Sequence, residues 1–296
     1  MDQAEKLRQI VQELKLKKTS MEPKEARIIA VTSGKGGVGK TNFTLNCGIA
    51  LKKIGYRVLI IDADFGLANI DVMLGITTKY NLFHVIDGKR KIQDVITEGP
   101  CGIKFISGGS GIWELINLSS HKLEEFMVML EGLDNIADII LIDTGAGVSE
   151  RILKMVLAAN EVIIITTPEP TAITDAYALV KSAVSINRDV TFRLVINRAE
   201  NQREANAVMD NFINVSNKFL DVKLQPLGYI LYDDSVMKST KQQKPFVIEY
   251  PKSQAAKQLN DIAYALTSSD IEGSDRPQGI KGYIYQMMNF LKTRRT

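Results

Sequence analysis

A glycine-rich run, GKGGVGKT at residues 34–41, strongly limits how this chain can fold. It fits the spacing G-x-x-x-x-G-K-[ST], and it lies between a β-branched stretch and a helical stretch, as that motif requires. The glycines let successive backbone N–H groups turn inward around a triphosphate, and the start of the next helix attracts negative charge. Lys40 is predicted to contact the β and γ phosphates, and the Thr41 hydroxyl to bind Mg²⁺. A glycine turn with a chance lysine would not account for both flanks. The residues expected to hold the nucleotide here are Gly34, Lys35, Gly36, Gly37, Val38, Gly39, Lys40, Thr41 and Asn42.

Short β-branched runs alternate with longer amphipathic stretches from residue 28 onward. This alternation is typical of βαβ units and a parallel sheet. Several runs, such as residues 162–165, are continuously apolar, as strands covered on both faces should be. The predicted fold class is therefore α/β, a doubly wound, mostly parallel sheet with helices on both faces. Seven strands are expected, at residues 28–33, 57–62, 103–107, 139–143, 162–167, 191–197 and 224–231.

Composition excludes several other classes of protein. Of the 296 residues, 45% are apolar and 24% are charged, as in an ordinary globular chain. Cys47 and Cys101 stand alone, without a CxxC pair or a suitably spaced histidine, so a reducing, cytoplasmic compartment fits best. No apolar run approaches the roughly 18 residues of a spanning helix, and no signal-peptide core is present near the start. We expect a protein that is neither secreted nor integral to a membrane.

Carboxylates end two of the predicted strands. Asp62 and Asp64 close the second strand, and Asp143 closes the fourth. Ligands of open α/β sheets bind beyond the carboxyl ends of the strands, so these acids should converge on the glycine-rich loop. Asp143 is predicted to hold Mg²⁺ through its water shell. A single aspartate at a strand end would more often be a helix cap or a turn former, but three beside a phosphate loop favour a metal site.

Lys35, directly after the first glycine, produces the deviant form K-G-G-x-G-K-T of the phosphate loop. Residues 62–71 read DADFGLANID, residues 143–147 read DTGAG, and residues 197–198 are Asn-Arg. In these motifs the chain resembles the MinD/ParA class of P-loop ATPases over most of residues 28–268. The resemblance implies a MinD-like fold, ATP and Mg²⁺ as cofactors, and slow ATP hydrolysis that depends on dimerisation.

The same resemblance implies roles for individual residues. Lys35 would reach across a dimer to the phosphates of the other subunit, and Asp64 would orient or activate the attacking water. Asp62 and Asp143 would organise the magnesium shell. The catalytic set is then Lys35, Lys40 and Asp64, and the metal set is Thr41, Asp62 and Asp143.

Four further residues are implied to bind the nucleotide. Gly145 and Gly147 belong to a stretch that would sense the γ-phosphate. Asn197 would hydrogen-bond the adenine edge. Arg198 would pack against the base, although a surface salt bridge is an open alternative.

Two short segments lie outside the expected ATPase domain, residues 27–268. Residues 1–26 would form an N-terminal amphipathic helix and linker, since Ala4, Leu7, Val11 and Leu14 share a helical stripe. By spacing alone, a partner-binding helix and a plain extension are equally open. Residues 269–279 are rich in Ser, Gly, Asp and Pro and predict a linker, with the segment that follows tethered rather than packed.

Residues 280–296 place apolar side chains on one helical face and carry four bases and no acid. This pattern is typical of a helix that lies in a membrane interface beside anionic lipid, and MinD-like tails are similar. The alternative is a helix docked on the ATPase body, and in the monomer we expect the apolar face to fold back onto that body. The predicted location is the cytoplasm, with reversible association at the inner face of the cell membrane. The residues expected at the membrane are Ile280, Ile284, Met287, Met288, Leu291, Lys292, Arg294 and Arg295.

Within the MinD/ParA class, the chain resembles the FlhG family, also called FleN or YlxH, of regulators of flagellar number and placement. The matching segments are DTGAG at 143–147, GGSG at 108–111 followed by Glu-Leu at 114–115, and DQAEKLR at 2–8. In that family the last of these activates the SRP-type GTPase FlhF. The resemblance therefore implies FlhF, flagellar switch (C-ring) proteins and a second copy of the chain as partners. The candidate partner-binding residues are Gln3, Leu7 and Arg8.

Two other functions share this phosphate loop. One is DNA partitioning of the ParA type, but residues 28–279 carry a net charge of about −3, which indicates no sequence-wide basic surface, although a local patch is an open alternative. The tail fits a membrane better than DNA, so no nucleic acid partner is expected. The other is an iron–sulfur carrier of the same fold, which would need bridging cysteines that this chain lacks at a suitable spacing.

Overall fold

A computed structural model of the chain describes residues 25–64, 69–108, 120–268 and 279–292. Its centre is an eight-stranded sheet with the order β3-β4-β2-β5-β1-β6-β7-β8. Every neighbouring pair is parallel except β3 and β4, which are antiparallel at one edge. The strands are β1 Arg27–Ser33, β2 Val58–Ala63, β3 Ile96–Glu98, β4 Lys104–Ser107, β5 Ile139–Ala146, β6 Glu161–Thr166, β7 Thr191–Ala199 and β8 Leu224–Leu231.

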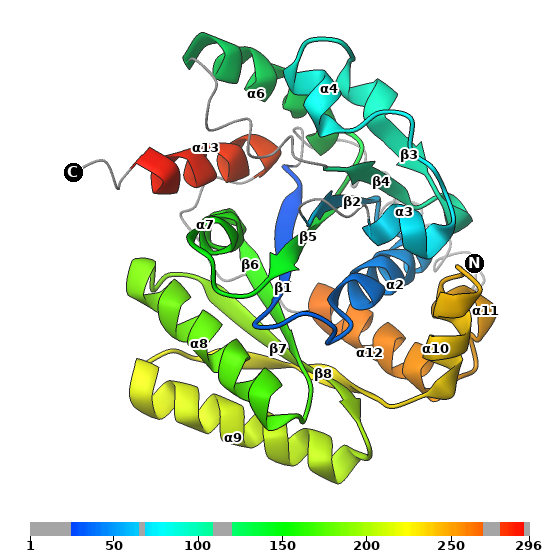
Figure 1. Ribbon diagram of the computed structural model, residues 1–296, viewed down its shortest axis with the longest axis vertical. Coiled ribbons are helices and arrows are strands. Elements are labelled where there is room, and N and C mark those ends of the chain that lie inside the picture. The colour runs from blue at the N-terminus through cyan, green and yellow to red at the C-terminus, as the bar shows by residue number, and fades with distance from the viewer. Residues whose placement is uncertain (1–24, 65–68, 109–119, 269–278, 293–296) are drawn as a thin grey trace, which may run out of the picture.

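Helices cover both faces of this sheet (Figure 1). One face carries a core with α6, α7, α8, α9 and α13, and the other carries a core with α2 and α12. The α-helices among the described residues are α2 Lys40–Lys53, α3 Asn69–Leu74, α4 Leu82–Ile86, α6 Ser120–Asp134, α7 Glu150–Ala158, α8 Pro170–Ile186, α9 Gln202–Leu220, α10 Asp234–Lys241, α11 Phe246–Glu249, α12 Gln254–Ser268 and α13 Gly279–Lys292, with 3₁₀ turns at Ile92–Val95 and Pro100–Gly102.

The predicted α/β class and all seven predicted strands are confirmed, with ends that differ by up to three residues. The apolar run of β6 is buried along its whole length, because helices pack on both sides of it. The sequence prediction missed β3, a three-residue edge strand that is too short to show alternation. None of the described helices is both long enough and apolar enough to cross a bilayer.

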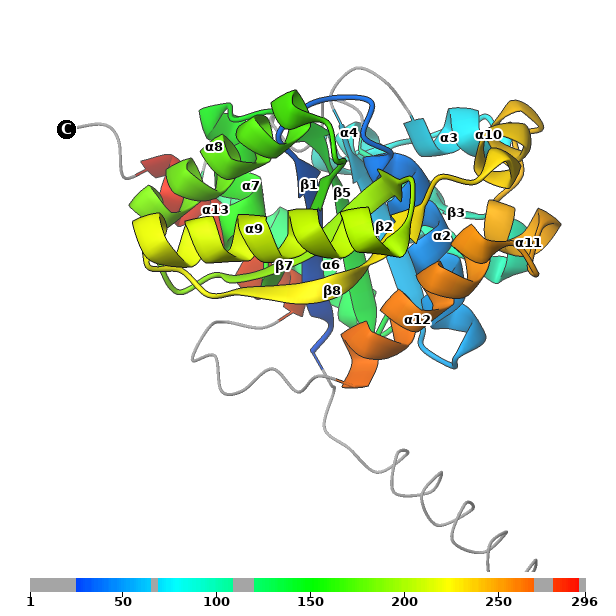
Figure 2. The ribbon, with the colours of Figure 1, turned by 90° about the horizontal axis from the view of Figure 1, so that it is seen from below.

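The expectation that the C-terminal segment is tethered rather than packed is wrong for this structure. Helix α13 lies against α6, α7 and β1, on the opposite side of the sheet from α2 and α12 (Figure 2). Its apolar face joins the main core, where the five residues of that face are between 0 and 7% exposed. These are Ile280, Tyr283, Ile284, Met287 and Met288. The structure therefore matches the docked form that the sequence indicated for the monomer.

One carboxylate holds the start of this helix. Asp134, at the end of α6, accepts hydrogen bonds from the Ile280 N–H at 3.1 Å and from the Ala26 N–H at 3.2 Å. Burial raises its pKa, while the two backbone donors oppose that rise. Gly279 has φ +72°, and a Cβ there would lie 2.8 Å from the Asp134 carboxylate. The residue that precedes β1 and the first turn of α13 thus meet at one side chain of α6.

The two cysteines have contrasting surroundings. Cys47 lies inside α2 with 0% exposure, and burial raises the pKa of its thiol to about 12. Cys101 is exposed. Because thiol reagents attack the thiolate, only Cys101 should react in the folded protein.

We expect Ellman's reagent to modify one thiol per native chain and both thiols after denaturation in guanidinium chloride. Cys101→Ser should abolish the native reaction, whereas Cys47→Ser should leave it intact. Fast native labelling of two thiols would contradict the packing of α2.

Candidate nucleotide-binding site

The glycine-rich loop connects the end of β1 to the start of α2. Gly39 precedes the helix with φ +96°, a left-handed conformation that favours glycine. Gly34 is needed for a different reason, because a Cβ there would lie 2.1 Å from the carbonyl carbon of Asp175 in α8. The loop therefore packs closely against α8 on one side. A Cβ at Gly36 would meet no atom within 4 Å, so on that side the loop backbone is open.

Lys40 and Asp143 form a buried ion pair below the loop. The Lys40 Nζ lies 3.1 Å from Oδ1 of Asp143, and the two side chains are 7% and 0% exposed. Thr44 donates to the same oxygen at 3.0 Å. The other oxygen, Oδ2, is buried and has no hydrogen-bond partner among the described residues. A buried carboxylate oxygen without a donor fits the water shell of Mg²⁺, which Thr41 at the cavity wall would help to hold.

Asp62 lies beside Asp143 because β2 and β5 pair in parallel with these residues in register. Burial, together with repulsion from Asp143, raises the pKa of Asp62 to about 7. Its Oδ1 accepts the Asp64 N–H at 3.2 Å, and its Oδ2 accepts the Ile70 N–H at 3.1 Å. In this structure Asp62 thus holds both ends of the segment that begins at Asp64. Its predicted metal role stays a prediction.

Asp64 and Lys35 differ in how they relate to the cavity. Asp64 lines it, and the Asn69 Nδ2 donates to Asp64 Oδ2 at 2.9 Å. Lys35 does not line it. Instead, its Nζ contacts Glu169 Oε2 at 2.8 Å and Thr171 Oγ1 at 2.9 Å, at the start of α8. The pKa of Glu169 is lowered by the hydrogen bond from Lys35 and by the lysine's charge.

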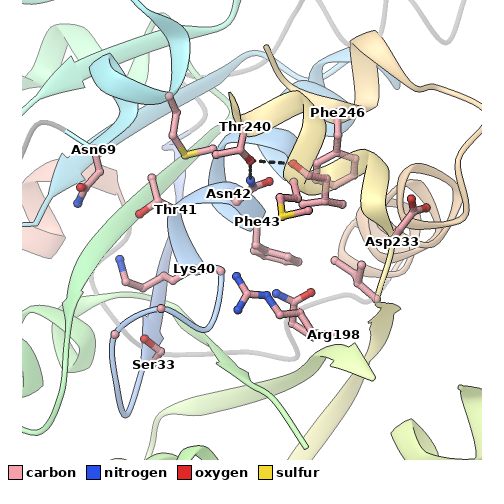
Figure 3. Close-up of a pocket in the computed structure, with 18 of the residues that line it drawn as sticks. Ser33, Lys40, Thr41, Asn42, Phe43, Asn69, Arg198, Asp233, Thr240 and Phe246 are labelled. Atoms are coloured by element: carbon pink, nitrogen blue, oxygen red, sulfur yellow. Dashed lines mark hydrogen bonds between the residues drawn. The ribbon is translucent and has the colours of Figure 1, made fainter. Parts of the chain in front are cut away.

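The cavity has a volume of about 690 Å³ and runs between two chemically different ends (Figure 3). Lys40, Thr41 and Asn69 lie at one end, and Arg198, Asp233 and Phe246 at the other. The first end suits phosphates, and the second offers an aromatic ring and polar groups for a base. Asn42 donates to Thr240 Oγ1 at 2.9 Å and joins α2 to α10 along the wall (Figure 3).

Asn197 has a further contact that the sequence did not indicate. Its Nδ2 donates to the Val38 carbonyl at 2.7 Å, so this side chain ties the end of β7 to the glycine-rich loop. Arg198 follows with φ +60° and lines the cavity. The adenine contact implied for Asn197 stays a prediction, because the bond to Val38 uses one N–H of the amide and leaves its oxygen and its second N–H for a base.

The end of β5 and the residue that follows it, Gly147, also approach the loop. The Gly147 N–H donates to the Ser33 carbonyl at 2.9 Å. A Cβ at Gly145 would lie 3.2 Å from Asp64 Oδ1. The structure therefore brings together the loop, Asp64, Asp143 and both glycines.

Sequence reasoning did not predict the part of the cavity wall that lies outside the sequence motifs. Its apolar and polar residues come from α2, α3, α10, α11 and the end of β8, and no motif marks them. They are Phe43, Val72, Met73, Tyr232, Val236, Met237, Thr240, Lys241 and Phe246.

Several predicted residues are not part of this cavity. Gln3, Leu7, Arg8, Arg294 and Arg295 lie outside the described residues. Leu291 and Lys292 end α13, but their side chains are outside the description. The buried face of α13 packs against α6, α7 and β1, and none of its described residues lines the cavity.

The parallel sheet, the glycine-rich loop before α2, and the buried Lys40–Asp143 pair define a P-loop nucleotide-binding protein. A ParA family model, described as "NUBPL iron-transfer P-loop NTPase", matches residues 24–267. The chain belongs to this family of MinD/ParA P-loop ATPases. The resemblance noted in the sequence is thereby confirmed.

Two relatives are similar to the chain over most of its length. The chain is 38% identical over 260 residues to the antiactivator FleN of Pseudomonas aeruginosa, covering 87% of this chain and 91% of FleN. It is 35% identical over 268 residues to the flagellum site-determining protein YlxH of Helicobacter pylori, covering 90% of each.

The solved structure of a related protein supports a nucleotide and Mg²⁺ as cofactors. The chain is similar to the septum site-determining protein MinD of Pyrococcus horikoshii OT3 in complex with Mg-ADP. The TM-score is 0.64 at 25% identity, covering 81% of this chain and 96% of MinD. Nucleotide and Mg²⁺ binding by a related protein of this fold agrees with the donor set around Lys40, Thr41 and Asp143.

Two glycines of the loop should respond differently to a methyl group. Gly34→Ala should lower the free energy of unfolding by about 1–3 kcal/mol, because its Cβ meets the backbone of α8. Gly36→Ala, with open space around it, should leave thermal stability near wild type and weaken binding of fluorescent ATP. Thermal denaturation without nucleotide, paired with a binding titration, distinguishes them. Equal stability of the two variants would contradict the close packing of Gly34.

Proposed function

We propose that this protein is an ATP-controlled switch that regulates the number and placement of bacterial flagella. The observation that carries the proposal is the position of Lys35, which belongs to the phosphate loop yet points outward to Glu169 and Thr171. A lysine placed this way can leave its pair and reach the phosphates of a second copy. The flagellar role is supported by the similarity to FleN and YlxH.

Hydrolysis in this proposal depends on positioning and charge neutralisation, as phosphoryl transfer generally does. Lys40 and the loop N–H groups would bind the phosphates, and Thr41 with Asp143 and Asp62 would hold the Mg²⁺ that neutralises them. Asp64 would orient the attacking water. Lys35 from the second copy would complete each site, so turnover would be slow and would follow dimerisation.

Membrane recruitment in this proposal uses helix α13. Its apolar face is buried in the described structure, so membrane binding requires the helix to leave the body. Two released helices in one dimer would bind lipid about 100-fold more tightly than one, through effective concentration. The Tyr283 hydroxyl is buried without a hydrogen-bond partner among the described residues, and this opposes docking.

Proposed partners follow from the same similarity. The N-terminal segment, with Gln3, Leu7 and Arg8, would bind and stimulate the GTPase FlhF, and another surface would meet the flagellar switch proteins. A peptide of residues 2–18 that fails to stimulate FlhF would remove this part of the proposal while leaving the ATP switch intact.

Dimerisation is testable by light scattering after size exclusion. We expect one chain per particle with ADP and two with a nonhydrolysable ATP analogue. Lys35→Ala should remain monomeric with the analogue, because the charge that bridges the two sites is gone. Lys89→Ala is the matched control, since it removes a surface lysine paired with Asp87 outside the cavity. A particle mass that does not depend on the nucleotide, or a Lys35→Ala dimer of wild-type affinity, would contradict the proposed ATP-dependent dimerisation.

Membrane binding is testable by sedimentation with vesicles of phosphatidylethanolamine and phosphatidylglycerol. We expect more binding with the ATP analogue than with ADP, and none after deletion of residues 280–296. Tyr283→Phe removes the unpaired buried hydroxyl and should strengthen docking by about 1 kcal/mol, which lowers release about fivefold. Tyr285→Phe is the matched control, since Tyr285 is 55% exposed on the same helix. Vesicle binding that is equal with ADP and ATP would refute the recruitment step.

The family match favours testing one second candidate, a ParA-type DNA-partitioning ATPase. Salt-dependent binding of nonspecific DNA by the ATP-bound protein would support that function and contradict the expectation of no nucleic acid partner. The description of the matching family model names iron transfer. The purified protein should therefore also be assayed for iron, and none is expected.

A further inference from the structure

The segment between β2 and α3 begins and ends with side chains that contact each other. Asn69, the first residue of α3, donates from Nδ2 to Asp64 Oδ2 at 2.9 Å. Both residues line the phosphate end of the cavity. An ionised carboxylate only accepts hydrogen bonds, so the amide nitrogen must face it. An asparagine at a helix start usually accepts a backbone N–H instead, which makes this contact different from an ordinary cap.

The two oxygens of Asp64 consequently differ. Oδ2 is held by Asn69, whereas Oδ1 faces Gly145, where a Cβ would approach to 3.2 Å. A group that orients a water must present one oxygen at a fixed position and angle. With Oδ2 held, rotation of the carboxylate is restricted, and Oδ1, which accepts no hydrogen bond from the described residues, is the oxygen left to bind a water.

Asn69 is itself firmly supported. The next residue, Ile70, is fully buried, and its N–H is held by Asp62. One turn further along α3, the Val72 carbonyl accepts a hydrogen bond from Gln243 Nε2 at 2.8 Å. The helix that carries Asn69 is therefore attached through its backbone to the sheet and to the segment that follows α10.

We propose that Asn69 is a positioning residue for ATP hydrolysis, which holds the Asp64 carboxylate so that its free oxygen meets the attacking water. The inference rests on the proposed ATPase function and on the role of Asp64 in it. No bond to nucleotide is assigned to Asn69. Its loss should therefore slow the chemical step and leave nucleotide binding nearly unchanged.

The experiment measures kcat and KM for ATP of the full chain, at protein concentrations where light scattering finds the dimer with a nonhydrolysable analogue. Asn69→Ala should lower kcat about 10- to 100-fold, as misplacement of a catalytic group does, and change KM by less than about threefold. Asn69→Asp, which removes the donor and places a second negative charge beside Asp64, should be at least as slow. Asn201→Ala is the matched control, since Asn201 caps α9 outside the cavity by accepting the Glu204 N–H.

A double-mutant cycle separates positioning from a general loss of structure. In an Asp64→Ala background, Asn69→Ala should cause no further fall in kcat, because the group it positions is absent. A kcat for Asn69→Ala within twofold of wild type, or an equal fall in both backgrounds, would overturn the inference. A wild-type chain that dimerises but does not hydrolyse ATP would instead overturn the proposed function.

Discussion

The buried carboxylate of Asp143 is the interaction on which the rest of the site depends. It neutralises Lys40 below the phosphate loop and accepts the Thr44 hydroxyl, so both contacts join the end of β5 to the start of α2. Burial of an ion pair away from water costs free energy unless the geometry of the pair is good, and removal of either partner would leave a buried charge unpaired. The pair therefore favours one placement of the loop relative to the sheet.

Parallel pairing extends this constraint to the neighbouring strands. Asp62 is in register with Asp143, and their mutual repulsion, added to burial, shifts the pKa of Asp62 to about 7. Asp62 in turn holds the backbone at both ends of the segment that starts at Asp64. The water-orienting candidate Asp64 is thus linked to the phosphate loop through Asp62, two residues before it, and through Asp143 on the neighbouring strand.

The first described residues before β1 and the last described helix, α13, are held together on the face of the sheet that α6 and α7 cover. Helix α13 contributes to the same core that covers β1, and Asp134 holds its first turn beside the backbone of Ala26. An apolar helix face with basic neighbours suits either a protein core or a lipid surface. In this structure the apolar face of α13 lies in the protein core. The proposed switch requires that the docked and the membrane-bound forms of the helix differ only modestly in free energy. The Tyr283 hydroxyl, buried without a partner among the described residues, reduces the advantage of the docked form.

Residue patterns were enough to predict the α/β class, seven strands, the phosphate loop and the acids that converge on it. Each of these depends on local spacing or on the rule that parallel strands end at a common edge. Three contacts could be seen only once the chain was folded: Lys35 pairs with Glu169, Asn197 donates to the Val38 carbonyl, and α10 forms part of the cavity wall. Docking of α13 was expected for the monomer, but the surface that it covers, made by α6, α7 and β1, is known only from the structure. These contacts join residues more than 100 positions apart, and periodicity reports which face of an element is apolar but not which surface will cover it.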